Sequence, residues 1–142
     1  MKIRDVMTKD VIKVAPEESV EVAARTLAQH NIGILPVCDH RGKVCGLVTD
    51  RDLVTRCIAA NRAPNDTPVS DVMTRQVTWA DPEMQLNVAA GIMGRVQVRR
   101  LPVVENGGLC GMVSLGDLAR RKETVMEAAG ALSDISDNLS DR

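Results

Sequence analysis

The sequence predicts a mixed α/β (α+β) fold built from two tandem β-α-β-β-α units and one further helix at the C-terminal end. Three observations predict it: an internal repeat, a strand-and-helix pattern inside each copy, and an apolar stripe near the end of the chain. With 142 residues, of which 44% are hydrophobic, the chain can bury a compact core. It is too short for a large multidomain enzyme.

The repeat begins with a shared four-residue string. Asp5-Val6-Met7-Thr8 recurs as Asp71-Val72-Met73-Thr74, about 66 residues later, and Leu35-Pro36-Val37 recurs as Leu101-Pro102-Val103. One residue is then lost in a turn, and the match continues. We therefore expect repeat 1 at 1–60, a linker rich in Pro, Asn and Asp at 61–68, repeat 2 at 69–121 and a tail at 122–142, with the two repeats packed with pseudo-two-fold symmetry.

Each element of the first copy has its own signal. Residues 11–14 form a short apolar run that predicts a strand, and Ser19 can cap a helix whose apolar residues share one face. The β-rich runs 34–38 and 44–49 flank a polar turn that contains a glycine, which predicts a hairpin. A second helix is expected from about Asp50.

The second copy repeats this order, with its hairpin turn at 105–108. Its first helix has a weaker start, because Gln85 stands where Ser19 can cap in copy one. In the tail, apolar residues spaced three and four apart predict an amphipathic helix, although Gly130 weakens it. These residues are Val125, Ala128, Leu132, Ile135 and Leu139. The stripe either packs on its own domain or forms a subunit contact, and it is too short for a true coiled coil.

Composition and charge exclude several classes of partner. The net charge of −1, from 18 basic and 19 acidic residues, offers no field for nucleic acid or an anionic membrane. Trp79 is the single aromatic residue, so stacking platforms for single strands cannot be built. The sequence contains no apolar signal region and no spanning segment, which predicts a cytoplasmic protein with reduced cysteines.

Two strings that follow the hairpins carry a family resemblance. GLVTDRDL at 46–53 and GMVSLGDL at 111–118 share a glycine, two apolar residues, Thr or Ser, and an aspartate three residues later. With Leu-Pro-Val before each hairpin, the doubled pattern resembles the cystathionine-β-synthase (CBS) domain family, and in particular the stand-alone CBS pairs of bacteria and archaea. The resemblance covers residues from about 5 to 121.

The resemblance implies a regulatory module rather than an enzyme. Such a module binds an adenine nucleotide or a related adenosyl ligand in the cleft between its repeats and signals by a conformational change, commonly as a disc-shaped homodimer. The residues agree with the absence of catalysis, since the sequence has no P-loop, dinucleotide glycine signature or nucleophile arrangement. No cofactor is required, and AMP, ADP, ATP and S-adenosylmethionine are the candidate ligands. The sequence does not name the effector protein.

The candidate ligand residues begin with the two polar pairs. Thr49 and Asp52 are three residues apart at a strand-to-helix junction and so face the same side, as do Ser114 and Asp117. A carboxylate there can accept hydrogen bonds from the two hydroxyl groups of a ribose, and a hydroxyl group before a helix can help bind phosphate. The alternative is that each pair only caps its helix.

The family resemblance adds the residues around the base. It places apolar walls for adenine at Val11, Ile12, Pro36 and Val37 in one cleft and at Val77, Thr78, Pro102 and Val103 in the other. All of these can equally be ordinary core strand residues.

The two copies differ in their candidate phosphate ligands. Arg99 and Arg100 precede Leu101 where copy one has Gly33 and Ile34, whereas Arg51 belongs to copy one alone. Guanidinium groups suit phosphate, so we expect unequal clefts, of which at most one binds a nucleotide strongly.

Two other interpretations stay open. In the first, the chain is a ligand-free interaction or dimerisation module. In the second, it is a metal-binding CBS protein that uses Cys38, His40 and Cys45 around one hairpin. The second of these lacks a fourth ligand, so we do not expect zinc.

Overall fold

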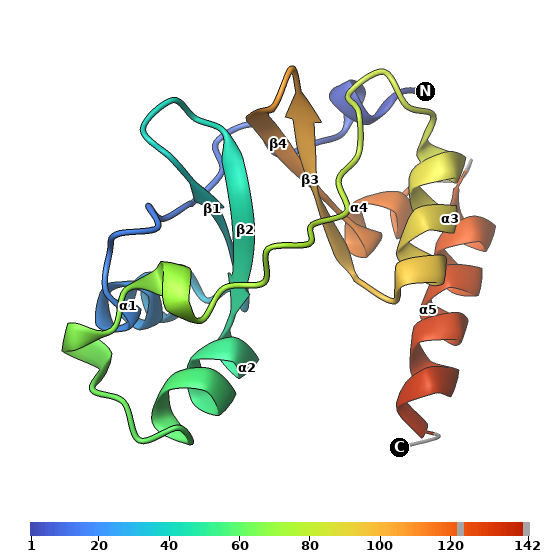
Figure 1. The fold of residues 1–142 in the computed structure, drawn as a ribbon. Coiled ribbons are helices and arrows are strands. Elements are labelled where there is room, and N and C mark those ends of the chain that lie inside the picture. Colours follow the sequence, from blue (N-terminus) through green and yellow to red (C-terminus); the bar gives the residue numbers. More distant parts are fainter. Residues whose placement is uncertain (122–123, 141–142) are drawn as a thin grey trace. The chain divides into compact units, whose positions relative to one another are not determined.

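The computed structural model describes residues 1–121 and 124–140, with side chains as far as residue 137 (Figure 1). The chain divides into two compact units. One unit, which we call the N-repeat unit, contains residues 12–77 and 107–109. The other, the C-repeat unit, contains residues 1–11, 78–106 and the chain from residue 110 onward.

The N-repeat unit begins its regular structure with α1 (Val20–His30). Ser19 is its N-cap, as the sequence predicts, because its side chain accepts a hydrogen bond from the backbone N–H of Val22 at 3.2 Å. Strands β1 (Ile34–Cys38) and β2 (Val44–Thr49) follow, then α2 (Asp50–Leu53), which continues as a π-helical turn η2 (Val54–Ile58). Short 3-10 helices η3 (Pro64–Asp66) and η4 (Val69–Asp71) complete the unit.

The strand predicted at residues 11–14 is shorter than expected. Only Val14 pairs, as a single parallel bridge to Val37, with hydrogen bonds from Val14 N–H to the Pro36 carbonyl and from Cys38 N–H to the Val14 carbonyl. Ala80 forms the same parallel bridge to Val103 in the C-repeat unit. The neighbouring proline Pro16 has no N–H to donate, which helps to explain why the ladder does not extend.

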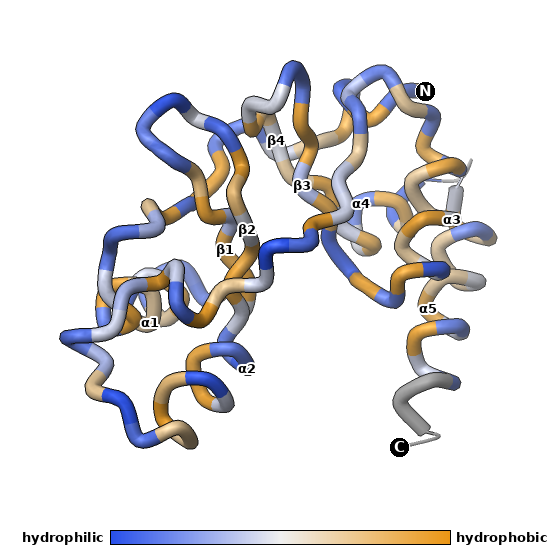
Figure 2. The backbone as a smooth tube through the Cα atoms, in the orientation of Figure 1, coloured by the Kyte–Doolittle hydropathy of each residue, from blue (hydrophilic) through white to orange (hydrophobic). Residues whose placement is uncertain are grey.

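The β1–β2 hairpin sets the positions of the first polar pair. Its strands are antiparallel, with Ile34 opposite Thr49 and Val37 opposite Gly46. The register then shifts so that Cys38 faces Val44, which leaves Cys45 in an irregularity of the ladder. The strands are hydrophobic and their turn is hydrophilic (Figure 2), which keeps the hairpin turn toward water.

The C-repeat unit contains η1 (Ile3–Asp5), α3 (Leu86–Val96), strand β3 (Arg100–Glu105), α4 (Leu115–Ala119) and α5 (Val125–Ser140). It also contains strand β4 (Gly108–Ser114), which is antiparallel to β3, from Cys110 onward. Gln85 makes no side-chain cap at the start of α3, as predicted. The core of this unit is apolar and closely packed. Its fully buried members include Ile3, Leu86, Met93, Leu101, Val103, Val113 and Leu118.

The four-residue string that opens each repeat, at 5–8 or at 71–74, belongs to the compact unit that contains most of the other repeat. Ile3 donates its N–H to the Met84 carbonyl at 2.9 Å, and Thr8 pairs with Met112 of β4. The equivalent Thr74 pairs with Leu47 of β2. The compact units are therefore interleaved along the chain and differ from the continuous spans 1–60 and 69–121.

Glycines allow this close approach of the two strings. A Cβ at Gly46 would lie 2.8 Å from the Thr74 carbonyl oxygen, and one at Gly111 would lie 3.0 Å from the carbonyl oxygen of Thr8. The contact at Gly46 is too short for a Cβ unless the backbone shifts, and the contact at Gly111 is tight enough that the string would have to give way, so glycine is favoured where each string crosses its β-strand.

The apolar stripe predicted in the C-terminal helix packs on the C-repeat unit, to which the helix itself belongs. This agrees with the first of the two interpretations, that the stripe packs on its own domain. Ala128, Ala131 and Ile135 of α5 are buried in the core formed with α3 and α4. Val125 and Leu132 stay 43% and 42% exposed. The side chain of Leu139 lies outside the described residues, as do residues 122–123 and 141–142 of the predicted tail.

Candidate functional site

The two predicted polar pairs are capping boxes in the structure. Thr49 Oγ1 accepts from the backbone N–H of Asp52 at 3.1 Å, and Asp52 Oδ2 accepts from the backbone N–H of Thr49 at 3.0 Å. Ser114 and Asp117 repeat this arrangement at 3.1 and 2.9 Å. Capping is therefore a function of all four residues, and it holds each carboxylate in one orientation.

The second oxygen of each carboxylate faces a guanidinium group. Asp52 Oδ1 lies 3.9 Å from Arg56 Nε, and Asp117 Oδ1 lies 3.6 Å from Arg120 Nη1. The two carboxylate side chains are only 13% and 20% exposed, whereas their arginine partners are 50% and 79% exposed. Because mobile exposed ion pairs are weak, this second oxygen is the atom that a ligand hydroxyl group can reach.

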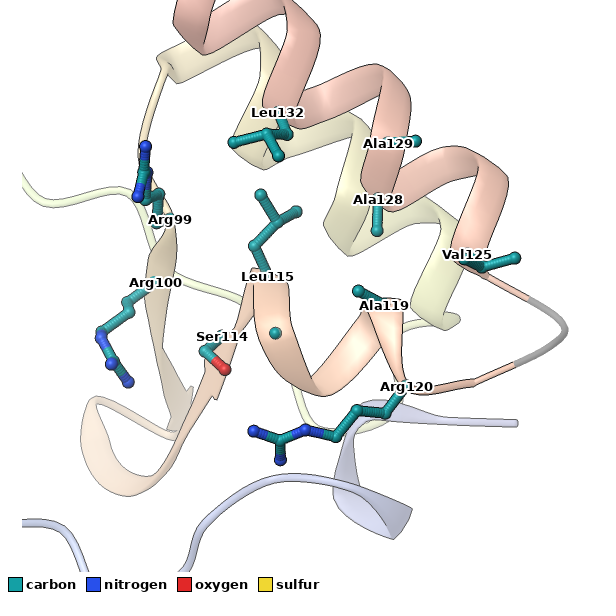
Figure 3. Close-up of a pocket in the computed structure, with 11 residues that line it drawn as sticks. Arg99, Arg100, Ser114, Leu115, Ala119, Arg120, Val125, Ala128, Ala129 and Leu132 are labelled. Carbon is teal, nitrogen blue, oxygen red and sulfur yellow. The ribbon is translucent and has the colours of Figure 1, made fainter.

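A cavity of about 500 Å³ opens in the C-repeat unit beside Ser114. In Figure 3, Leu115 of α4 and Leu132 of α5 point toward one another on one side, and Ser114 lies between the side chains of Arg100 and Arg120. No acidic residue is among the described residues that line this cavity. Its lining is Arg99, Arg100, Ser114, Leu115, Gly116, Ala119, Arg120, Val125, Ala128, Ala129 and Leu132.

A second cavity of about 340 Å³ in the same unit is lined by Val6, Asp117, Arg120 and Arg121. Arg120 borders both cavities. The structure therefore gathers the predicted Arg99, Arg100 and Ser114 at one cavity and the predicted Asp117 at the next.

In the N-repeat unit the side chain of one arginine already forms hydrogen bonds with the backbone. Arg56 donates from Nη1 to the carbonyl oxygens of Val72 and Met73, at 3.1 and 3.2 Å. The predicted phosphate ligand Arg51 is exposed and follows Asp50, whose carboxylate accepts a hydrogen bond from the Arg51 N–H at 2.8 Å. Copy one therefore has an acidic residue directly beside its predicted phosphate ligand, whereas the described lining of the cavity at Ser114 contains none.

The predicted base-wall residues are mostly part of the core. Val37 and Val103 are completely buried, and the carbonyls of Pro36 and Pro102 accept hydrogen bonds from Val14 and from Ala80, respectively. Val11, Ile12 and Val77 are half-buried and Thr78 is exposed. A ligand can meet these four side chains more easily than the buried valines.

The sequence reasoning missed Leu115, Arg120 and the α5 residues that line the larger cavity. Arg120 could have been found, because it follows Asp117 by three residues and so falls on the same face of a helix. The α5 residues could not, because the approach of α5 to β4 and α4 depends on packing between elements.

The structure does not bring Cys38, His40 and Cys45 together as a group of metal ligands. The part of the chain that the structure describes contains no group of three or more His, Cys, Asp or Glu side chains placed to hold a metal ion, and this part includes Cys38, His40 and Cys45. The thiol of Cys45 instead donates to the Val37 carbonyl at 3.3 Å, and that of Cys110 donates to the Val103 carbonyl at 3.3 Å. Burial raises the pKa of Cys38, Cys45 and Cys110, which favours the neutral thiol in the metal-free protein.

No helix within the described residues is long and apolar enough to cross a bilayer.

The CBS domain family model matches residues 3–58 and 69–129, and so covers both repeats. The chain belongs to the CBS domain family. It is 40% identical over 134 residues to the CBS domain-containing protein YhcV of Bacillus subtilis, which covers 94% of each chain. It is 32% identical over 117 residues to Hypoxic response protein 1 of Mycobacterium tuberculosis, which covers 82% of each.

Solved CBS structures share its architecture. A crystal structure of Hypoxic Response Protein I with two coordinated zinc ions superposes with a TM-score of 0.79 at 31% identity, covering 85% of this chain and 98% of that one. The CBS domain pair of protein MJ0100, in complex with 5′-methylthioadenosine and S-adenosyl-L-methionine, gives 0.74 at 28% identity, covering 84% and 94%. CBS pairs are in general regulatory modules without catalytic activity, and both repeats of this chain have the fold of such a module.

Proposed function

We propose that this CBS pair is a regulatory module that binds an adenine nucleotide or a related adenosyl ligand at its second repeat. The cavity beside Ser114 carries the proposal, because it combines the two kinds of surface that such a ligand needs. Leu115, Val125 and Leu132 supply apolar area for a base, and Arg99 with Arg100 supplies positive charge for phosphate.

The ribose would be bound by Asp117 in the adjoining cavity. Its Oδ1 is free of the capping hydrogen bond and can accept from a ribose hydroxyl group in place of the long ion pair to Arg120. Since α4 has only five residues, its dipole adds little, and the guanidinium groups must supply most of the attraction for an anion.

The neighbour that binds S-adenosyl-L-methionine and 5′-methylthioadenosine supports the adenosyl class of ligand. Binding would act on a partner only through a difference in ligand affinity between two shapes of the module, as for any two-state switch.

Titration calorimetry of the full chain tests the proposal. We expect binding of at least one compound among AMP, ADP, ATP, S-adenosylmethionine and 5′-methylthioadenosine, and a loss of about tenfold or more in affinity in Asp117→Asn, which keeps the size of the side chain. Asp52→Asn is the matched variant in the other repeat and should have a much smaller effect. Absence of heat with all five compounds at millimolar concentration would overturn the proposal.

A second candidate is a ligand-free interaction module, in which the polar pairs serve only as caps. The complete capping boxes at Asp52 and Asp117 favour it, because each pair already has a structural function. It predicts that Asp117→Asn changes stability without changing any ligand affinity. A homodimer fits both candidates, and light scattering of the purified chain measures it directly.

A further inference from the structure

The second repeat gathers positive charge that the first repeat lacks. Arg99, Arg100 and Arg120 line the larger cavity, and Arg120 and Arg121 line the smaller one. Among the described residues that line the two cavities, four carry guanidinium groups and one, Asp117, carries a carboxylate, so these side chains together have a formal charge of +3.

Most of these guanidinium groups have no partner within the described part of the protein. Among the described residues, the side chains of Arg99, Arg100 and Arg121 make no hydrogen bond or ion pair, and Arg120 has only its 3.6 Å contact with Asp117. Gathering like charges is unfavourable unless an anion offsets their repulsion, so this arrangement is the kind found where a polyanion binds.

The equivalent positions of the first repeat are occupied differently. The residues that correspond to Arg99, Arg100 and Arg120 are Gly33, Ile34 and Thr55. The counterpart of Arg121 is Arg56, and its guanidinium group is bound to the Val72 and Met73 carbonyls.

The contact made by Arg56 differs from the surroundings of its counterpart at the smaller cavity. Val6 is the repeat counterpart of Val72, and in the C-repeat unit it lines the cavity together with Arg121. Arg121, the repeat counterpart of Arg56, makes no such side-chain hydrogen bond among the described residues. The guanidinium group of Arg121 instead borders the cavity next to Asp117.

We propose that the ligand of the second repeat carries two or more phosphate groups, which the guanidinium groups of both cavities bind together. The proposal rests on the proposed function and narrows it to nucleoside di- and triphosphates or related polyphosphate esters. S-adenosylmethionine, whose sulfonium centre adds positive charge, is bound more weakly because the four arginines repel it. Arg120 is common to both cavities and contacts the middle of the anionic chain.

Titration calorimetry with adenosine, AMP, ADP, ATP, S-adenosylmethionine and inorganic tripolyphosphate tests the proposal. We expect ATP and ADP to bind about tenfold or more tightly than AMP, and S-adenosylmethionine to bind more weakly than ATP. Affinity for ATP should fall steeply with added salt, because the arginines are exposed and their field is screened.

Three variants separate the possible outcomes. The double variant Arg99→Ala/Arg100→Ala and the single variant Arg121→Ala should each bring the ATP-to-AMP affinity ratio toward one without weakening adenosine. Arg95→Ala is the control, since Arg95 is an exposed residue of α3 that lines neither cavity.

Equal affinities for ATP and AMP, or indifference of their ratio to both arginine variants, overturns the polyphosphate proposal while the adenosyl function stands. Binding of tripolyphosphate that the variants weaken, without binding of any adenosyl compound, overturns the adenosyl function and supports the polyphosphate site. If neither tripolyphosphate nor any adenosyl compound binds, both proposals are wrong.

Discussion

Thr49 and Asp52 exchange hydrogen bonds across the junction of β2 and α2, with the side chain of each accepting from the backbone N–H of the other at 3.1 and 3.0 Å. Ser114 and Asp117 do the same at the junction of β4 and α4. Any substitution at these positions therefore changes a helix cap as well as the candidate ligand site. Experiments on ligand binding need stability measurements beside them.

Loss of either capping hydroxyl group should lower stability. Thr49→Ala and Ser114→Ala each remove the acceptor for one backbone N–H, and we expect each to reduce the free energy of unfolding by about 1 kcal/mol. Thr49→Ser keeps the acceptor and should stay close to wild type. Urea denaturation measures all three, and equal stability of Thr49→Ala and Thr49→Ser would show that the cap contributes nothing.

The glycines that precede these junctions should not tolerate alanine. Gly46→Ala and Gly111→Ala place a Cβ within 3.0 Å of a backbone carbonyl oxygen, so we expect each to destabilise the fold by about 1–3 kcal/mol. Gly91→Ala is the matched control, because nothing lies within 4 Å of a Cβ at this position in α3. That variant should be neutral or stabilising by up to about 1 kcal/mol, since alanine favours helix. Thermal unfolding in which Gly46→Ala and Gly91→Ala behave alike would contradict the close approach.

The N-terminal segment should stabilise the C-repeat unit. Ile3 is fully buried in the core of that unit, so Ile3→Ala should cost about 2–4 kcal/mol through lost burial and a residual cavity. Ile58→Ala is the control, because Ile58 is 57% exposed and its loss should change stability by less than about 0.5 kcal/mol. Hydrogen exchange of α3 amides should speed up in Ile3→Ala. Unchanged protection there would mean that the segment does not belong to this unit.

Acid should weaken the attachment of the N-terminus. A hydrogen bond from Lys2 holds the pKa of Glu83 below its ordinary value, and the charge of Arg4 lowers it further. A carboxyl group whose pKa is lowered by folding adds stability above its unfolded pKa and loses it as the pH falls through the folded pKa, here below the ordinary pKa of a glutamate. Stability measured against pH should therefore fall less steeply on the acid side in Glu83→Gln and in Lys2→Met. Identical acid limbs in wild type and both variants would show that the ion pairs do not couple to folding.

The repeat and most elements were predictable because they rest on local patterns. The Ser19 cap, the missing cap at Gln85 and both hairpins follow from residue type and spacing, and the structure confirms each. The capping boxes also follow from spacing, since a hydroxyl group and a carboxylate three residues apart meet at any helix start. The strand at residues 11–14 was overestimated, because a single bridge, at Val14, is all that tertiary pairing provides.

The sequence by itself determined the CBS family, the two unequal copies, the position of Ser114 and Asp117 at a strand-to-helix junction and that of Arg99 and Arg100 before the preceding strand. Only the tertiary structure decided that the string of each repeat packs on the unit of the other, because that contact joins residues far apart in the chain through glycines that leave room for it. It likewise decided that Arg120 and α5 complete the larger cavity. Cavities form between elements, where packing rather than local pattern sets which side chains meet.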